Sequence, residues 1–206
     1  MEDHQQLPEI LAALKNYAEQ HHVPIMEEQG ISELIELLKS QQPKSILEIG
    51  AAIGFSAIKM ASELPDCTVD TIERDDGRYN KAVEFIGQSG LENQIRIFHG
   101  DALELDLDLL KPAYDAIFID AAKGQYERFF EKYEKLLSER GIIYCDNMHM
   151  HGLSEQEISE VPRRKRTMIR NLRKFKEYML NHPSYETTLL SAGDGIMICR
   201  KKAQEK

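Results

Sequence analysis

The feature that most limits how this chain can fold is the alternation of short apolar runs with longer amphipathic segments. Runs such as SILEIG and DAIFID are separated by stretches whose apolar residues recur at helical spacing. Such alternation is typical of a parallel sheet covered by helices on both faces. Near the C-terminus, YETTLL and GIMICRK flank the turn-like SAGDG and predict a hairpin. We therefore expect an α/β fold with a mostly parallel seven-stranded sheet that ends in an antiparallel hairpin.

The expected elements follow one another regularly along the chain. Helices are predicted over residues 8–20, 27–39, 54–64, 76–90, 126–139 and from 162 onward, with a short helical piece over 105–110. Strands are predicted at SILEIG, CTVDTIE, QIRIFHG, DAIFID, GIIYCD, YETTLL and GIMICRK. The polar stretch 149–161 is expected to be a loop.

Length and composition narrow the class of protein. A chain of 206 residues, with 42% hydrophobic and 30% charged residues, suits a single globular domain. The N-terminus lacks the basic and apolar regions of a signal peptide, and the longest apolar runs are far shorter than the ~20 residues that span a bilayer. Three cysteines without C-x-x-C spacing are expected to be buried and reduced. We expect a cytoplasmic protein without a membrane partner.

The segment LEIGAAIGFS carries the first predicted strand directly into a helix. Gly50 and Gly54 would let the backbone turn tightly and approach a ligand at the start of that helix. The nicotinamide fingerprint G-x-G-x-x-G does not fit, because three residues separate these glycines. The glycines alone are equally compatible with a plain strand-to-helix turn.

Polar residues after the next two strands favour a ligand that contains adenosine. Glu73 ends the second strand, where its carboxylate can accept hydrogen bonds from both hydroxyls of a ribose. Asp101 and Ala102 follow the third strand and could approach an adenine ring. Glu48 lies inside the first strand, where a buried carboxylate is costly unless it is paired or near a cationic ligand.

Oxygen ligands for a hard metal are predicted at the ends of the fourth and fifth strands. Asp120 follows one, Asp146 and Asn147 follow the other, and adjacent strands would bring them together. Oxygen donors without His or Cys suit Mg²⁺, Mn²⁺ or Ca²⁺ rather than zinc. Lys123 could remove a proton from a hydroxyl acidified by the metal, because a nearby cation disfavours its ammonium form. The alternative is that Asp120 caps a helix, Asp146 and Asn147 form a turn, and Lys123 is solvated.

One segment concentrates positive charge in an otherwise acidic chain. The stretch VPRRKRTMIRNLRKFK holds eight Lys and Arg residues and no acid, whereas the whole chain has a formal net charge of -9. A helix here would place its apolar residues on one face and its arginines on another. The segment is either a solvated helix or a surface that binds phosphates, which arginine binds with two parallel hydrogen bonds. The candidate phosphate-binding residues are Arg163, Arg164, Lys165, Arg166, Arg170 and Arg173.

Taken together, these motifs resemble those of the cation-dependent S-adenosylmethionine O-methyltransferases of the catechol and caffeoyl-CoA type. The resemblance covers roughly residues 24–200 and implies a Rossmann-like class I methyltransferase fold. It assigns the cofactor to Met26, Glu48, Gly50, Ser56, Glu73, Asp101, Ala102 and Asp120. It assigns the metal, Mg²⁺ with Mn²⁺ as an alternative, to Asp120, Asp146 and Asn147, and the role of catalytic base to Lys123.

The resemblance also implies how the chain is organised. Residues 1–206 would form one domain, with helices of residues 1–40 covering the cofactor and residues 148–180 forming a substrate-side loop and basic helix. The sequence has Ala121 and Ala122 where animal catechol enzymes have bulky residues, so aromatic gating of a small catechol is not expected. A homodimer remains open.

Within the family, the VPIMEEQG and RRKRTMIRN segments are most similar to the bacterial branch that methylates 5-hydroxyuridine in tRNA. The leading hypothesis is methylation of the wobble base in a tRNA anticodon stem-loop to 5-methoxyuridine, since that base offers two neighbouring oxygens to one metal. One alternative is methylation of small catechols or CoA-linked phenols. Another is a noncatalytic RNA-binding module that retains the cofactor fold.

Overall fold

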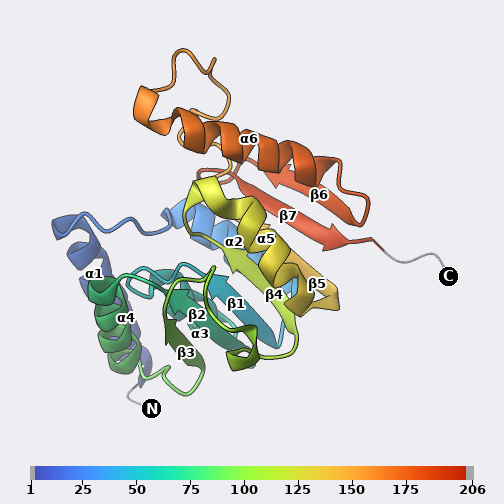
Figure 1. The fold of residues 1–206 in the computed structure, drawn as a ribbon. Coiled ribbons are helices and arrows are strands. Elements are labelled where there is room, and N and C mark those ends of the chain that lie inside the picture. Colours follow the sequence, from blue (N-terminus) through green and yellow to red (C-terminus); the bar gives the residue numbers. More distant parts are fainter. Residues whose placement is uncertain (1–2, 203–206) are drawn as a thin grey trace.

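A single seven-stranded sheet forms the centre of the computed structural model, which describes residues 3–202 (Figure 1). The strands lie in the order β3-β2-β1-β4-β5-β7-β6. Their bounds are β1 (Ser45–Ile49), β2 (Thr68–Glu73), β3 (Ile95–His99), β4 (Tyr114–Ile119), β5 (Leu137–Cys145), β6 (Tyr185–Leu190) and β7 (Ile196–Lys201). This is the predicted architecture, including the C-terminal hairpin.

The direction of the strands determines where a ligand can bind. β1 pairs in parallel with both β2 and β4, β2 with β3, and β4 with β5, whereas β7 is antiparallel to β5 and β6. The chain leaves β1 toward β2 and later returns to β4 on the other side of β1. In open parallel sheets, ligands bind beyond the carboxyl ends of the strands at such a reversal of order.

Helices cover both faces of the sheet, as predicted (Figure 1). They are α1 (Asp3–Gln20), α2 (Glu28–Gln41), α3 (Phe55–Glu63), α4 (Asp76–Gln88), α5 (Tyr126–Tyr133) and α6 (Arg166–Leu180). Short 3-10 helices span Leu107–Leu109, Lys123–Gln125, Glu134–Leu136 and Arg163–Lys165. No helix within residues 3–202 is long and apolar enough to cross a membrane.

The two faces of the sheet pack into two hydrophobic clusters because side chains alternate along each strand. Ile46 and Phe118 point into one cluster, with the buried faces of α1, α2, α3 and α4. Leu47 and Ile117 point into the other, with α5 and α6. Strands buried on both faces explain the continuous apolar runs in the sequence.

Three predicted boundaries were wrong or incomplete. Helix α1 begins at Asp3, since Pro8 removes only one hydrogen bond near the start of the helix. The helix predicted over 126–139 ends at Tyr133, and β5 already begins at Leu137, which is buried and pairs with Tyr114. Gly141 therefore lies inside a strand rather than at the end of a helix. The basic segment begins as a 3-10 turn and becomes α6 at Arg166.

Candidate active site

A cavity of about 500 Å³ opens at the carboxyl ends of the parallel strands. Its walls come from the loops that follow β1, β2, β3, β4 and β5. Residues 24–27, Met168 of α6 and Asp194 of the β6–β7 turn complete the lining. The volume is in the range of sites that hold a cofactor-sized ligand.

The glycine turn after β1 brings two loops into close contact. Gly50 has a φ of 108°, and a Cβ built there would lie 2.2 Å from the carbonyl oxygen of Asp120. Gly54 has a φ of 89° and is the residue before α3. Only glycine combines this backbone with so little space, so the turn is built for close approach rather than serving as a generic connection.

Glu73 is placed as a hydrogen-bond acceptor at the end of β2. Its Oε2 accepts from the backbone N–H of Ala52 at 2.8 Å, and its Oε1 accepts from those of Arg74 and Asp75 at 2.9 and 2.8 Å. The side chain lines the cavity although the residue is only 7% exposed. Each carboxylate oxygen has further lone pairs, so Glu73 can still accept from a diol.

The loop after β3 forms the neighbouring wall. Asp101 Oδ1 accepts from the backbone N–H of Leu103 at 2.8 Å, and its carboxylate lies 3.6 Å from Arg74. The hydroxyl of Tyr133 donates to the carbonyl oxygen of Ala102 at 2.5 Å. Asp101 and Ala102 therefore line the cavity on a loop that α5 holds in place.

Glu48 and Ser56 lie beneath the cavity and do not line it. Glu48 is fully buried and accepts hydrogen bonds from the hydroxyls of Ser56 and Thr71, the latter at 2.5 Å. Burial raises the pKa of Glu48 to about 7, although both hydroxyl donors act to lower it. The contact of Glu48 and Ser56 with a cofactor, which the resemblance implies, stays a prediction.

Two carboxylates and an amine meet at the ends of β4 and β5. Lys123 Nζ donates to Asp120 Oδ1 at 2.6 Å, and both residues line the cavity together with Asp146. Burial, and then the charge of Asp120, raise the pKa of Asp146. The hydroxyl of the buried Tyr126 donates to the carbonyl oxygen of Asp146 at 3.0 Å and fixes the backbone there.

Asn147 lines the same cavity and is held by a residue that the sequence reading did not single out. Its Nδ2 donates to Asp194 Oδ2 at 3.2 Å. Across residues 3–202, no three His, Cys, Asp or Glu side chains gather as a metal-binding group. The predicted set is instead two carboxylates and one amide, and these oxygens are the donors that Mg²⁺ prefers.

The N-terminal segment closes the cavity from the other side. Met26 is 7% exposed and lines the cavity just before α2. A Cβ at Gly193 would lie 2.9 Å from Gly30 Cα, so α2 packs directly on the β6–β7 turn. This contact, which two distant glycines permit, brings the turn with Asp194 next to the segment that carries Met26.

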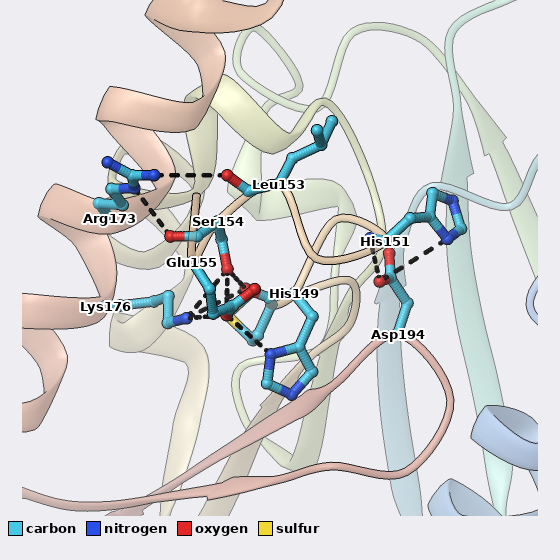
Figure 2. Close-up of polar contacts among 9 residues, drawn as sticks. His149, His151, Leu153, Ser154, Glu155, Arg173, Lys176 and Asp194 are labelled. Carbon is cyan, nitrogen blue, oxygen red and sulfur yellow. Dashed lines mark hydrogen bonds and ion pairs between the residues drawn. The ribbon is translucent and has the colours of Figure 1, made fainter. Parts of the chain in front are cut away.

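The basic residues of α6 and of the 3-10 turn before it divide into two groups. Arg166 and Arg173 donate to backbone carbonyls of the preceding loop, at Val161 and Ser159 for the first and at Ser154 for the second. Figure 2 shows Arg173 and Lys176 reaching that loop from α6. The side chains of Arg163, Arg164 and Arg170 are exposed, and Lys165 is partly buried. The predicted single row of arginines is therefore partly a structural support.

The structure thus brings most of the predicted residues to one cavity. Those that line it are Met26, Gly50, Glu73, Asp101, Ala102, Asp120, Lys123, Asp146 and Asn147. Sequence reasoning missed Tyr126, Met168 and Asp194, which come from α5, α6 and the hairpin turn. SAGDG was recognised as a turn, but its position in space depends on strand order.

The family model described as O-methyltransferase matches residues 1–202 of the chain. Tapetum-specific methyltransferase 1 of Arabidopsis thaliana is 34% identical over 184 residues, which are 87% of this chain and 77% of that protein. The caffeoyl-CoA O-methyltransferase of Populus kitakamiensis is 31% identical over 208 residues, covering 97% of this chain and 87% of that protein.

Solved structures agree with these sequence matches. A Staphylococcus aureus protein assigned as a caffeoyl-CoA O-methyltransferase superposes with a TM-score of 0.87 at 35% identity, covering 93% of this chain and 92% of that one. An O-methyltransferase from Bacillus cereus, solved in complex with SAH (S-adenosylhomocysteine), superposes with a TM-score of 0.81 at 25% identity, covering 94% and 91%.

Proposed function

The chain belongs to the O-methyltransferase family and is an S-adenosylmethionine-dependent O-methyltransferase, and from this premise we propose that it methylates one of two neighbouring oxygens on its acceptor with the help of Mg²⁺. One observation carries the proposal. Asp120, Asp146 and Asn147 line the same cavity as Glu73 and the Gly50 turn. The residues proposed for the cation and those proposed for the nucleoside therefore share one space.

The residues fit a divalent cation chemically. Asp120 and Asp146 are close enough for the charge of one to raise the pKa of the other, and a cation between them would offset that repulsion. Asp120, Asp146 and Asn147 would hold it. When bound there, Mg²⁺ would lower the pKa of the acceptor hydroxyl and fix the neighbouring oxygen.

The protein's own groups would position and deprotonate the acceptor. S-adenosylmethionine would supply the methyl group, which would pass in line from its sulfonium sulfur to the deprotonated acceptor oxygen, leaving SAH as a neutral thioether. Glu73 would accept hydrogen bonds from the ribose, while residues 101–102 would line the adenine. Lys123, whose Nζ is held at 2.6 Å from Asp120, would take the hydroxyl proton. Fixing both reactants in one cavity would supply much of the acceleration.

A small phenol of the catechol type, or a phenol linked to CoA, is the acceptor class that the relatives favour. The Populus relative and the Staphylococcus structure both carry caffeoyl-CoA O-methyltransferase names. Such acceptors present two adjacent oxygens on one ring. The exposed arginines of the basic segment, in which Met168 lines the cavity, suit the phosphates of CoA.

The second candidate acceptor is 5-hydroxyuridine in a tRNA anticodon loop. Met168 of α6 lines the cavity, and the exposed Arg170 lies on the same helix. The exposed Arg163 and Arg164 lie on the 3-10 turn directly before it. An RNA backbone would engage such a surface, with affinity that falls as salt rises. The tRNA base also presents a hydroxyl beside a carbonyl oxygen.

A panel of acceptors distinguishes the two. Purified protein, S-adenosylmethionine and Mg²⁺ are incubated with catechol, with caffeoyl-CoA and with tRNA that contains 5-hydroxyuridine, and products are identified by mass spectrometry. Substituting Arg163, Arg164 and Arg170 by Ala should reduce methylation of tRNA or caffeoyl-CoA while sparing catechol. No transfer to any acceptor with two neighbouring oxygens would overturn the proposal.

A further inference from the structure

We propose that Asp194, in the turn between β6 and β7, is a positioning residue that sets the direction of the Asn147 amide and the path of residues 147–151. The inference rests on the proposed function, because Asn147 is one of the residues assigned to the cation. We call residues 147–151 the strap. It follows β5 directly, and Asn147, Met150 and His151 line the cavity.

The backbone of the strap is unusual. Asn147, Met150 and His151 have φ angles of 59°, 49° and 54°. Non-glycine residues rarely adopt this left-handed region, and they keep it only where surrounding contacts hold them. Three such residues within five positions require a specific set of contacts.

The β6–β7 turn supplies those contacts through four hydrogen bonds. Two use the carboxylate of Asp194, since Oδ2 accepts from Asn147 Nδ2 at 3.2 Å and Oδ1 accepts from the backbone N–H of His151 at 2.5 Å. Two use backbone carbonyls, with His149 donating to Asp194 at 2.8 Å and Met148 donating to Gly195 at 3.0 Å. Figure 2 shows Asp194 facing His151.

The carboxylate also selects one orientation of the amide. A carboxylate only accepts hydrogen bonds, so Asp194 pairs with Nδ2 of Asn147 and would repel Oδ1. The amide oxygen is thereby left for the cation that Asp120 and Asp146 would share. Asp194 is 7% exposed, so water cannot easily replace this contact. Groups behind metal ligands commonly orient them in this way.

The far side of the strap is held independently. Lys176 Nζ donates to the carbonyl oxygen of Met148 at 3.2 Å, and the hydroxyl of Ser154 donates to the same oxygen at 2.8 Å (Figure 2). Removing the Asp194 carboxylate should therefore loosen the amide and His151 without unfolding the loop.

The test measures Mn²⁺ binding to the full chain by electron paramagnetic resonance. Asp194→Asn should weaken Mn²⁺ affinity by roughly tenfold to a hundredfold, which is the usual effect of losing such a partner. SAH affinity, measured by calorimetry, should change by less than about twofold because the nucleoside half of the cavity is untouched. Asp66→Asn is the matched control, since the side chain of Asp66 is 87% exposed and lies outside the cavity lining.

Two further variants separate orientation from charge. In an Asn147→Ala background, Asp194→Asn should have little additional effect if Asp194 acts through the amide, whereas full additivity overturns the inference. Asp194→Glu keeps the charge but displaces the carboxylate oxygens, so it should also weaken Mn²⁺ binding. This variant replaces Asp194→Asn in the test if Asp194→Asn does not fold. Unchanged Mn²⁺ affinity in both Asp194 variants would refute the positioning role of Asp194 but would leave the proposed cation site standing. A wild-type protein that binds SAH but no Mn²⁺ refutes the cation site and this inference with it.

Discussion

Lys123, the proposed general base, has Nζ beside Asp120 and a side chain that is 22% exposed. We expect Lys123→Ala to lower kcat by about 10²- to 10⁴-fold, the usual contribution of a general base. Lys123→Arg should be equally impaired, because a guanidinium keeps its proton. Single-turnover methyl transfer with saturating substrates measures the effect.

The control for Lys123 is Lys44→Ala, since Lys44 has a side chain that is 71% exposed and lies outside the cavity lining. It should retain the full rate. SAH affinity should stay within about twofold in every Lys123 variant, because no nucleoside contact is removed. A Lys123→Arg protein with the wild-type rate would contradict the base assignment.

Glu48 makes the stability of the protein depend on pH. Burial raises its pKa from 4.5 to about 7. Because the folded value is the higher one, its contribution is fully present below about pH 4.5 and is lost as pH rises through about 7. Between pH 5 and 8, the wild type should lose about 2–3 kcal/mol of unfolding free energy relative to Glu48→Gln.

Urea unfolding of both proteins at several pH values measures that difference. Groups other than Glu48 titrate in both proteins, so the difference between the two curves isolates the buried carboxyl. A difference that stays constant from pH 5 to 8 would mean that Glu48 has an ordinary pKa.

At the scale of elements, the β1–α3 turn depends on the missing side chain of Gly50. Its Cβ would meet the Asp120 carbonyl oxygen at 2.2 Å, so Gly50→Ala must displace one of the two loops that form the cavity. We expect a loss of more than about 2 kcal/mol in unfolding free energy and at least tenfold weaker SAH binding.

Gly87 of α4 is the matched control for Gly50. A Cβ at this position would have no neighbour within 4 Å, and it lies in a helix. Gly87→Ala should leave SAH binding intact and stabilise the protein by up to about 1 kcal/mol. Thermal unfolding and calorimetry compare the two. Equal tolerance of both substitutions would show that the turn has more room than its backbone indicates.

Helix α6 holds the preceding loop, residues 153–156, through Arg173. Arg173→Ala should lower the unfolding free energy by about 1–2 kcal/mol, since the Ser154 carbonyl, bonded at 2.8 Å, loses a charged donor. The exposed Arg170→Ala should change it by less than about 0.5 kcal/mol. Hydrogen exchange over residues 153–156 should rise only in the Arg173 variant. Equal exchange in both would indicate that the loop is held by other contacts.

Helices and strands with strong periodicity could be predicted from the sequence. The start of β5 shows why some element boundaries could not. The seven strands and the hairpin followed from apolar runs and turn residues. The start of β5 did not, because residues 126–139 continue an apolar spacing that also suits a helix. Only pairing of Leu137 with Tyr114 across the sheet decides the boundary, and that pairing is nonlocal.

At the scale of the whole molecule, the site also combines features that local sequence predicts with features that depend on nonlocal pairing. The convergence of Asp120, Asp146 and Asn147 on one cavity could be predicted, because parallel neighbouring strands end at one edge of the sheet. Asp194 could not, since it reaches Asn147 only through the antiparallel pairing of β7 with β5. The support that Arg166 and Arg173 give the loop was also hidden, because composition alone does not distinguish a solvated arginine from one bonded to carbonyls.

We propose that one cavity holds both a nucleoside, at Glu73, and a cation, at Asp120, Asp146 and Asn147. The most direct test follows methyl transfer to whichever panel acceptor gives product, after the protein is stripped with EDTA and again after Mg²⁺ is restored. SAH affinity is measured on the same samples. We expect the stripped protein to bind SAH but transfer no methyl group, and Mg²⁺ to restore the rate. An undiminished rate of methyl transfer without metal would contradict the proposed role of the cation.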